Sequence, residues 1–230
     1  AEIERDVAVS YGADLGKGFE YKSYVPASGK NPTDLMFDDS FNTDVFSIFG
    51  QYSVDLSDVT ELSIEGRYDK EKRSVNNNVP GVASALYYGG GAPINPAMAA
   101  VGDSIPSREK SFDQFQPKIS LTTSAENTTV YASYGVGFRS GGFNSSGSAA
   151  TTEFWLNSGN PFGLGVVGSQ LGVSDTFKKE VSKSFEVGFK GRYLDGRLEV
   201  NGAMFETDVD DNQFFEFFAG PWGLLRVVTN

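Results

Sequence analysis

Short and long connections alternate strictly along this chain, and this alternation restricts its possible folds more than any other feature. Three pairs of segments carry apolar residues at every second position, the pattern of a half-buried β-strand. The paired segments are 43–56 with 60–75, 115–124 with 128–139, and 183–194 with 197–208. Only a few residues join the members of each pair: near 57–58, at 125–127, and at Asp195 and Gly196, a frequent hairpin dipeptide. The sequence therefore predicts three β-hairpins.

The stretches between these hairpins, 75–112 and 139–180, are rich in glycine, serine, proline and asparagine. Loops of this length are uncommon in compact soluble domains. In an up-and-down sheet, all short turns lie at one end and all long loops at the other. This asymmetry is typical of outer-membrane barrels, which have short periplasmic turns and long extracellular loops. The predicted fold class is all-β: a segment of an antiparallel up-and-down transmembrane β-barrel, with about eight strands.

Alternation within the strands predicts which side of the wall each residue faces. In 128–139, the apolar set with Val130, Tyr134 and Phe138 is expected to face lipid, and the set from Tyr131 to Arg139 the lumen. Opposite charges are interleaved on the polar faces, which suits a hydrated lumen better than a dry core. The expected lumen-facing charges are Glu65, Arg67, Glu186, Lys190 and Arg192. The expected interfacial aromatic residues are Tyr68, Phe112, Phe115, Phe138 and Tyr193.

Composition excludes several classes of function. The chain has no cysteine and no histidine, which excludes disulfides, zinc fingers and catalysis by a thiol or an imidazole. A formal net charge of -11 argues against nucleic acid as a partner. Neighbouring carboxylates such as Asp210 and Asp211 point to opposite faces of a strand, so they do not form a glycosidase pair. We predict no enzyme, no catalytic residue and no cofactor.

Three motifs resemble the barrels of TonB-dependent outer-membrane receptors and follow the order of that family. They are "LSIEGRYDKEKRS", "VYASYGVGFRSGGFN" and "SKSFEVGFKGRYLDGRLEVNGAMFETDVDDNQ", and the resemblance covers residues 44–213. It implies a barrel of roughly 22 strands, plugged from the periplasmic side. It also implies uptake of a scarce nutrient, such as a ferric siderophore, cobalamin or a carbohydrate, with energy from the TonB complex.

The resemblance also sets the expected organisation and partners. Residues 1–230 are expected to form part of a single β-barrel domain, with the plug domain and the remaining strands outside this sequence. The expected location is the bacterial outer membrane. The expected partners are outer-membrane lipid, a small-molecule nutrient, and the TonB complex through the missing N-terminal region.

Candidate ligand-binding residues lie at the loops and the lumen rim. They are Arg139, Tyr87, Tyr88, Trp155 and Trp222. Two interpretations stay open for them: Arg139 contacts an anionic substrate or pairs with a lumen carboxylate, and the aromatics stack on ligand or pack the loops. The sequence "DVDDNQ" lacks the Gly and Glu of an EF-hand at the required positions, so no metal site is predicted.

Two alternatives to the receptor remain. A complete eight-stranded barrel, acting as an adhesin or a structural outer-membrane protein, requires its first and last strands to pair. A soluble β-sandwich binding module requires a wet outer face on the sheet. The sequence does not name the ligand.

Overall fold

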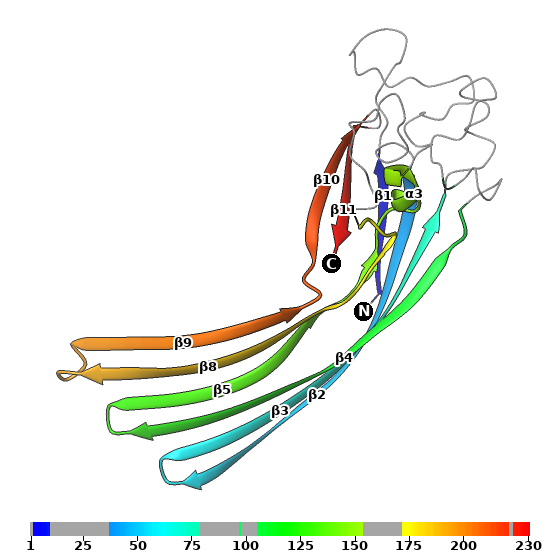
Figure 1. Ribbon diagram of the computed structural model, residues 1–230. Helices are drawn as coiled ribbons and strands as arrows, with labels where there is room; N and C mark the ends of the chain where they lie inside the picture. The colour runs from blue at the N-terminus through cyan, green and yellow to red at the C-terminus, as the bar shows by residue number, and fades with distance from the viewer. Residues whose placement is uncertain (1, 10–36, 79–96, 98–104, 154–171, 221–222) are drawn as a thin grey trace, which may run out of the picture.

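A computed structural model describes residues 2–9, 37–78, 97, 105–153, 172–220 and 223–230. Its main feature is one antiparallel seven-stranded sheet with the order β1-β2-β3-β4-β5-β8-β9 (Figure 1). The strands are β1 (Glu2–Val9), β2 (Phe37–Ser57), β3 (Thr60–Asn77), β4 (Arg108–Ala125), β5 (Thr128–Arg139), β8 (Glu180–Tyr193) and β9 (Leu198–Asp210). Each strand of this sheet pairs with the next one along the chain, and β6 and β7, which lie between β5 and β8 in sequence, form a separate pair. This arrangement confirms the predicted up-and-down antiparallel fold class.

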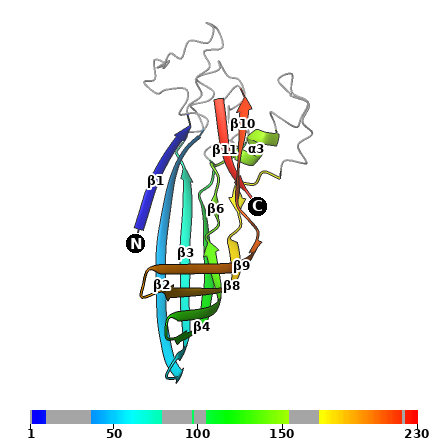
Figure 2. The ribbon, with the colours of Figure 1, turned by 90° about the vertical axis from the view of Figure 1, so that its left-hand side faces the viewer.

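Smaller elements gather at one end of the sheet, away from the hairpin turns (Figures 1 and 2). They are the hairpin β10 (Phe214–Gly220) with β11 (Gly223–Thr229), the short pair β6 (Gly142–Phe143) with β7 (Thr176–Phe177), and helix α3 (Ser148–Thr152). The sequence predicted only a long loop over 139–180, so β6, α3 and β7 are additions to that prediction. In the part of the chain that the structure describes, no helix is long and apolar enough to cross a membrane.

The three hairpins form as predicted, with small differences at the turns. The first turn is centred on residues 58–59 rather than 57–58. The third is longer than the expected two residues, because the last pair of β8 and β9 is Tyr193 with Leu198. Leu194, Asp195 and Gly196 have positive φ values of 54°, 53° and 84°. The predicted two-residue turn is therefore wrong, although Gly196 still supplies the left-handed position that glycine favours.

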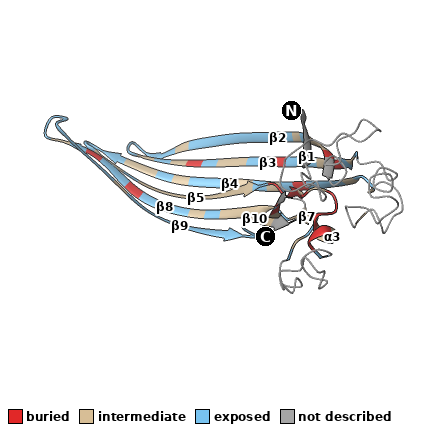
Figure 3. Ribbon diagram, turned by 90° about the horizontal axis from the view of Figure 1, so that it is seen from above, coloured by how far each residue is buried: buried red, intermediate tan, exposed pale blue. Residues whose placement is uncertain are grey.

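One face of the sheet is apolar across all its long strands. The register aligns Tyr52, Ile64, Ile119, Tyr134 and Phe185 in one row, and each of these side chains is at least 40% exposed. On β2 this face runs from residue 46 to residue 56. At about 3.4 Å per residue and a tilt of about 40°, that length covers roughly 26 Å, close to the roughly 25 Å band that faces lipid. Figure 3 shows how much of the strand length is exposed.

The opposite face, here called the polar wall, carries the charged and hydroxyl residues. The predicted division of β5 into two faces is confirmed, because Val130 and Tyr134 lie on the apolar face while Tyr131 and Arg139 lie on the polar wall. The placement of Phe112 among the interfacial aromatics is wrong. Phe112 pairs with Glu71 on the polar wall and is only 5% exposed. It lies under the segment that follows β5.

The described sheet is open. Among the described strands, β1 pairs only with β2 and β9 only with β8, so the closed ring required by the complete-barrel alternative is not formed. The sandwich alternative requires a second layer over the apolar face and water on the other. No described element packs on that apolar face, whose large side chains remain exposed. An exposed apolar surface of this extent marks contact with another apolar phase or partner.

Candidate functional site: the polar wall and the loop segment over it

The middle of the polar wall is a network of paired charges. Lys118 on β4 donates to Glu65 on β3 at 3.0 Å. The Nε of Arg67 lies 2.7 Å from Oδ2 of Asp69. The Asp69 side chain is 7% exposed, and its carboxylate also accepts hydrogen bonds from Ser47 and Gln116. Glu65 and Arg67 therefore lie on the polar wall, and each has a partner within the described sheet.

The next part of the wall is organised around the Tyr131 ring. Its hydroxyl donates to Glu186 at 2.5 Å, and the Lys190 ammonium lies 5.8 Å from the ring centroid. A Cβ at Gly188 would lie 2.6 Å from the same ring, so the ring occupies the space left by the missing side chain. This contact gives a physical reason for glycine in the "EVGFK" motif.

Arg192 and Arg139 lie toward opposite ends of the wall. Near the turns, Arg192 approaches Glu199 at 3.6 Å, and both side chains are more than half exposed. Where β5 ends, Arg139 approaches Glu180 at 4.0 Å and the Phe215 ring at 5.8 Å from its centroid. The other predicted ligand-binding residues lie outside the described residues: Tyr87, Tyr88, Trp155 and Trp222.

The segment that follows β5 turns back over the loop end of the polar wall. A Cβ at Gly141 would lie 2.3 Å from the Phe112 ring and 2.6 Å from the carbonyl oxygen of Phe177. A Cβ at Gly142 would lie 3.0 Å from the Arg73 guanidinium on β3. Only glycine allows the backbone to come this close to the wall. The two glycines of "SGGFN" are thus packing residues, and the loop root predicted here folds over the wall.

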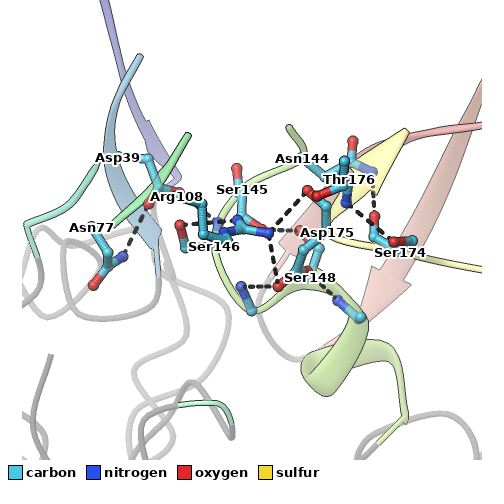
Figure 4. Close-up of polar contacts among 12 residues, drawn as sticks. Asp39, Asn77, Arg108, Asn144, Ser145, Ser146, Ser148, Ser174, Asp175 and Thr176 are labelled. Carbon is cyan, nitrogen blue, oxygen red and sulfur yellow. Dashed lines mark hydrogen bonds and ion pairs between the residues drawn. The ribbon is translucent and has the colours of Figure 1, made fainter. Parts of the chain in front are cut away.

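Asp39 anchors this segment to β2 (Figure 4). Its carboxylate accepts the backbone N–H of Ser146 at 2.8 Å and the Asn77 amide at 3.1 Å. The side chain is fully buried, and burial raises the pKa of the Asp39 carboxyl, although its hydrogen bonds and the charge of Arg108 oppose that rise. An ionised carboxylate is disfavoured away from water unless donors surround it.

Asp175 forms a second anchor, inside the segment itself (Figure 4). Its two carboxylate oxygens accept the backbone N–H groups of Gly147 at 3.0 Å and Ala149 at 2.8 Å. Arg108 on β4 lies 3.6 Å from the same carboxylate, and its guanidinium is 5.1 Å from the Phe143 ring centroid. The first turn of α3 is therefore tied to the wall through Asp175 and Arg108.

Two amide side chains connect the segment to the last described strands. The Asn144 side chain donates to the carbonyl of Val228 at 2.8 Å and accepts its N–H at 2.7 Å, as a neighbouring strand would. Gln213 donates to the carbonyls of Ser140 and Lys178 at 3.0 and 2.9 Å. The sequence placed these residues in its "SGGFN" and "DVDDNQ" motifs but did not predict their role. The signal that the sequence offered for this role was their position shortly after a predicted strand.

The acidic corner around Asp210 has a structural explanation. Asp210 lies 2.7 Å from the Lys183 ammonium, and Asp211 lies 2.7 Å from that of Lys178. Within the described ranges, no group of three histidine, cysteine or acidic residues is arranged to hold a metal ion. The corner is built from ion pairs.

Comparisons with known proteins agree with this architecture. Residues 3–228 match the model of the family described as TonB dependent receptor-like, beta-barrel. Among solved structures, the chain is similar to the copper transporter OprC, with 18% identity and a TM-score of 0.50 over 84% of this chain and 25% of that one. It is also similar to the ferric yersiniabactin uptake receptor FyuA from Yersinia pestis, with 13% identity and a TM-score of 0.49 over 76% and 22% of the two chains.

A third similar structure is the ferric-catecholate import receptor Fiu from E. coli K12, with 21% identity and a TM-score of 0.47 over 77% and 23% of the two chains. At such identities these likenesses concern the fold alone. The chain spans a quarter or less of the length of each of the three proteins. Because the family match covers nearly the whole sequence, the chain belongs to the TonB-dependent receptor β-barrel family.

Proposed function

We propose that this chain forms a sector of the wall of an outer-membrane receptor that imports a scarce small nutrient with energy from the TonB complex. Residues 1–230 are part of its single barrel domain. One observation carries the proposal: the segment after β5 folds over the loop end of the polar wall and is held there by two carboxylates. This arrangement puts a polar rim at the end of the sheet where the long loops lie.

Each part of the chain then has a physical role. The apolar face contacts outer-membrane lipid, and the polar wall lines a hydrated interior in which its charges are paired or solvated. The long loops capture the ligand, with Arg139 and the aromatic residues Tyr87, Tyr88, Trp155 and Trp222 as candidate contacts. A plug and a segment that binds TonB belong to the rest of the receptor. The ligand classes are a ferric siderophore, cobalamin or a carbohydrate.

Transport requires no covalent chemistry from the wall. The family is one of receptors and transporters. Many of the described polar side chains of the wall pair with one another or with the backbone, and they suit binding and positioning. The proposed function is therefore the selective passage of a small nutrient through the receptor.

Uptake measurements on the full-length receptor test this proposal. The receptor is produced in a bacterium that lacks its own high-affinity iron and cobalamin receptors, with and without a functional TonB. We expect accumulation of a labelled ligand from one of the three classes, and we expect that accumulation to disappear when TonB is absent. Uptake that continues without TonB, or no uptake from any class, would contradict the proposal. A strain without the receptor gives the background.

A further inference from the structure

The Phe215 ring brings together two arginines from different elements. The Cζ of Arg226, on β11, lies 3.9 Å from the ring centroid, a stacking distance. The Cζ of Arg139, at the end of β5, lies 5.8 Å from the same centroid. The residues are far apart in the sequence, and the β10–β11 hairpin places them together. Two positive charges held at one ring repel each other, and a nearby anion offsets that repulsion.

The carboxylates around this pair do not balance both charges. Oε2 of Glu180 lies 4.0 Å from Arg139, but the same oxygen also accepts the backbone N–H of Gln213 at 2.7 Å. Among the described residues, Arg226 makes no ion pair. Glu216, the acidic residue of β10, lies opposite Val227 rather than Arg226 in the register. It accepts a hydrogen bond from the hydroxyl of Thr229. Among the described residues, positive charge is therefore in local excess here, in a chain whose formal net charge is -11.

The face that carries this pair is accessible. Leu225 and Val227 point to the buried side of the hairpin, at 1% and 0% exposure. Alternation puts Arg226 on the other side, where Phe215 and Phe217 are 46% and 59% exposed. Arg139 belongs to the polar wall, so this face of the hairpin lies beside the loop end of that wall (Figure 1).

We propose that Arg226, Arg139 and Phe215 form a subsite for a planar oxyanion group of the imported ligand. A guanidinium donates two parallel N–H groups to adjacent oxygens, and contact with the Phe215 ring restricts the motion of the Arg226 guanidinium. The exposed rings of Phe215 and Phe217 offer surfaces for the planar part of such a group. The inference rests on the proposed function and narrows it, since it favours an anionic ligand over a neutral one.

Two complexes of iron(III) that differ in net charge test the subsite. The iron(III) tris-catecholate complex is an anion, whereas an iron(III) tris-hydroxamate is neutral. Binding of each to the purified full-length receptor is followed by quenching of tryptophan fluorescence over a series of salt concentrations. The wild type is expected to bind the anionic complex more tightly, with an affinity that falls as salt screens the arginines.

The variants separate the site from general charge effects. Arg226→Gln is expected to weaken binding of the anionic complex about tenfold, equivalent to about 1.4 kcal/mol. Arg226→Lys keeps the charge and is expected to lose less. Arg192→Gln is the matched control, because it removes an exposed arginine near the turns and is expected to bind like the wild type. Circular dichroism melting of each variant checks that the fold is kept.

Two results would overturn the inference: a wild type that does not bind the anionic complex, or an Arg226→Gln variant that binds it as tightly as the wild type. Uptake assays with and without TonB are run in parallel. TonB-dependent uptake of a neutral ligand, together with either of these results, would reject the anionic subsite and leave the proposed function standing. Loss of all TonB-dependent uptake would instead reject the function.

Discussion

Placing one arginine on each side of β4 tests which face of the sheet contacts lipid. Ile119 lies on the apolar face, is 45% exposed, and pairs with Ile64 on β3 and Tyr134 on β5. Ser120 is the next residue and lies on the polar wall. The variants Ile119→Arg and Ser120→Arg therefore introduce the same charge on opposite faces at almost the same depth.

The expected energies follow from the position of Ile119 in the apolar band. It follows Phe115, an outward aromatic nearer the loop end, by four positions. At about 3.4 Å per residue and a tilt of about 40°, Ile119 lies roughly 10 Å below Phe115, near the middle of a band about 25 Å tall. An arginine at that depth costs about 2–4 kcal/mol. Ser120→Arg faces water, so its cost should stay below about 0.5 kcal/mol.

The measurement is the free energy of folding of the full-length receptor into phospholipid vesicles, from urea titrations followed by tryptophan fluorescence. We expect Ile119→Arg to lower the urea midpoint strongly and Ser120→Arg to leave it nearly unchanged. Equal costs for both variants would show that neither face contacts lipid. A larger cost for Ser120→Arg would show that the two faces have been assigned in reverse.

Three further predictions concern the segment over the wall. Gly141→Ala places a Cβ 2.3 Å from a ring carbon and should increase cleavage of the segment in limited proteolysis, whereas Gly50→Ala, with nothing within 4 Å, should not. Asp175→Asn removes a carboxylate that accepts hydrogen bonds from two backbone amides. The free energy that protects those amides should fall by about 1–3 kcal/mol, so their hydrogen exchange should accelerate by one to two orders of magnitude. Asp195→Asn at an exposed turn is the control. Because burial raises the pKa of Asp39, its ionisation opposes folding. The stability of the wild type relative to Asp39→Asn should thus be greatest at acid pH and fall as pH rises through that raised pKa, which urea titrations at several pH values would measure.

The strands could be predicted because their signal is local. A period of two in hydropathy fixes both the existence of a strand and the side on which each residue lies. The same rule explains the error at Phe112. It is separated from Phe115 by three positions, so the two rings cannot lie on the same face of β4. Proximity to a strand end suggested an interfacial residue, but the alternation within the strand placed it on the polar wall.

The contacts of the loop segment could not be read from a local pattern. Asp39 and Ser146 are 107 positions apart, and Asn144 and Val228 are 84 positions apart. Such pairs come together only after the strands have aligned in register. A buried aspartate also has no signature in the sequence that separates it from an exposed one. The Arg226–Phe215 stack depends in the same way on the pairing of β10 with β11.

Helix α3 shows how the wall determines the structure of the loop. It has five residues, far below the roughly 12–15 that an isolated helix needs to be even marginally stable in water. Its N-cap residue is Gly147, which has no side chain that could cap the helix. Instead, the carboxylate of Asp175 accepts the N–H groups of Gly147 and Ala149, and that of Asp39 accepts the N–H of Ser146. The negative charge of Asp175 at the N-terminus of the helix is stabilising, whereas Asp39 contributes as a hydrogen-bond acceptor. The helix therefore exists because the wall and the loop supply its cap, and a change at either aspartate should act on the whole segment over the rim.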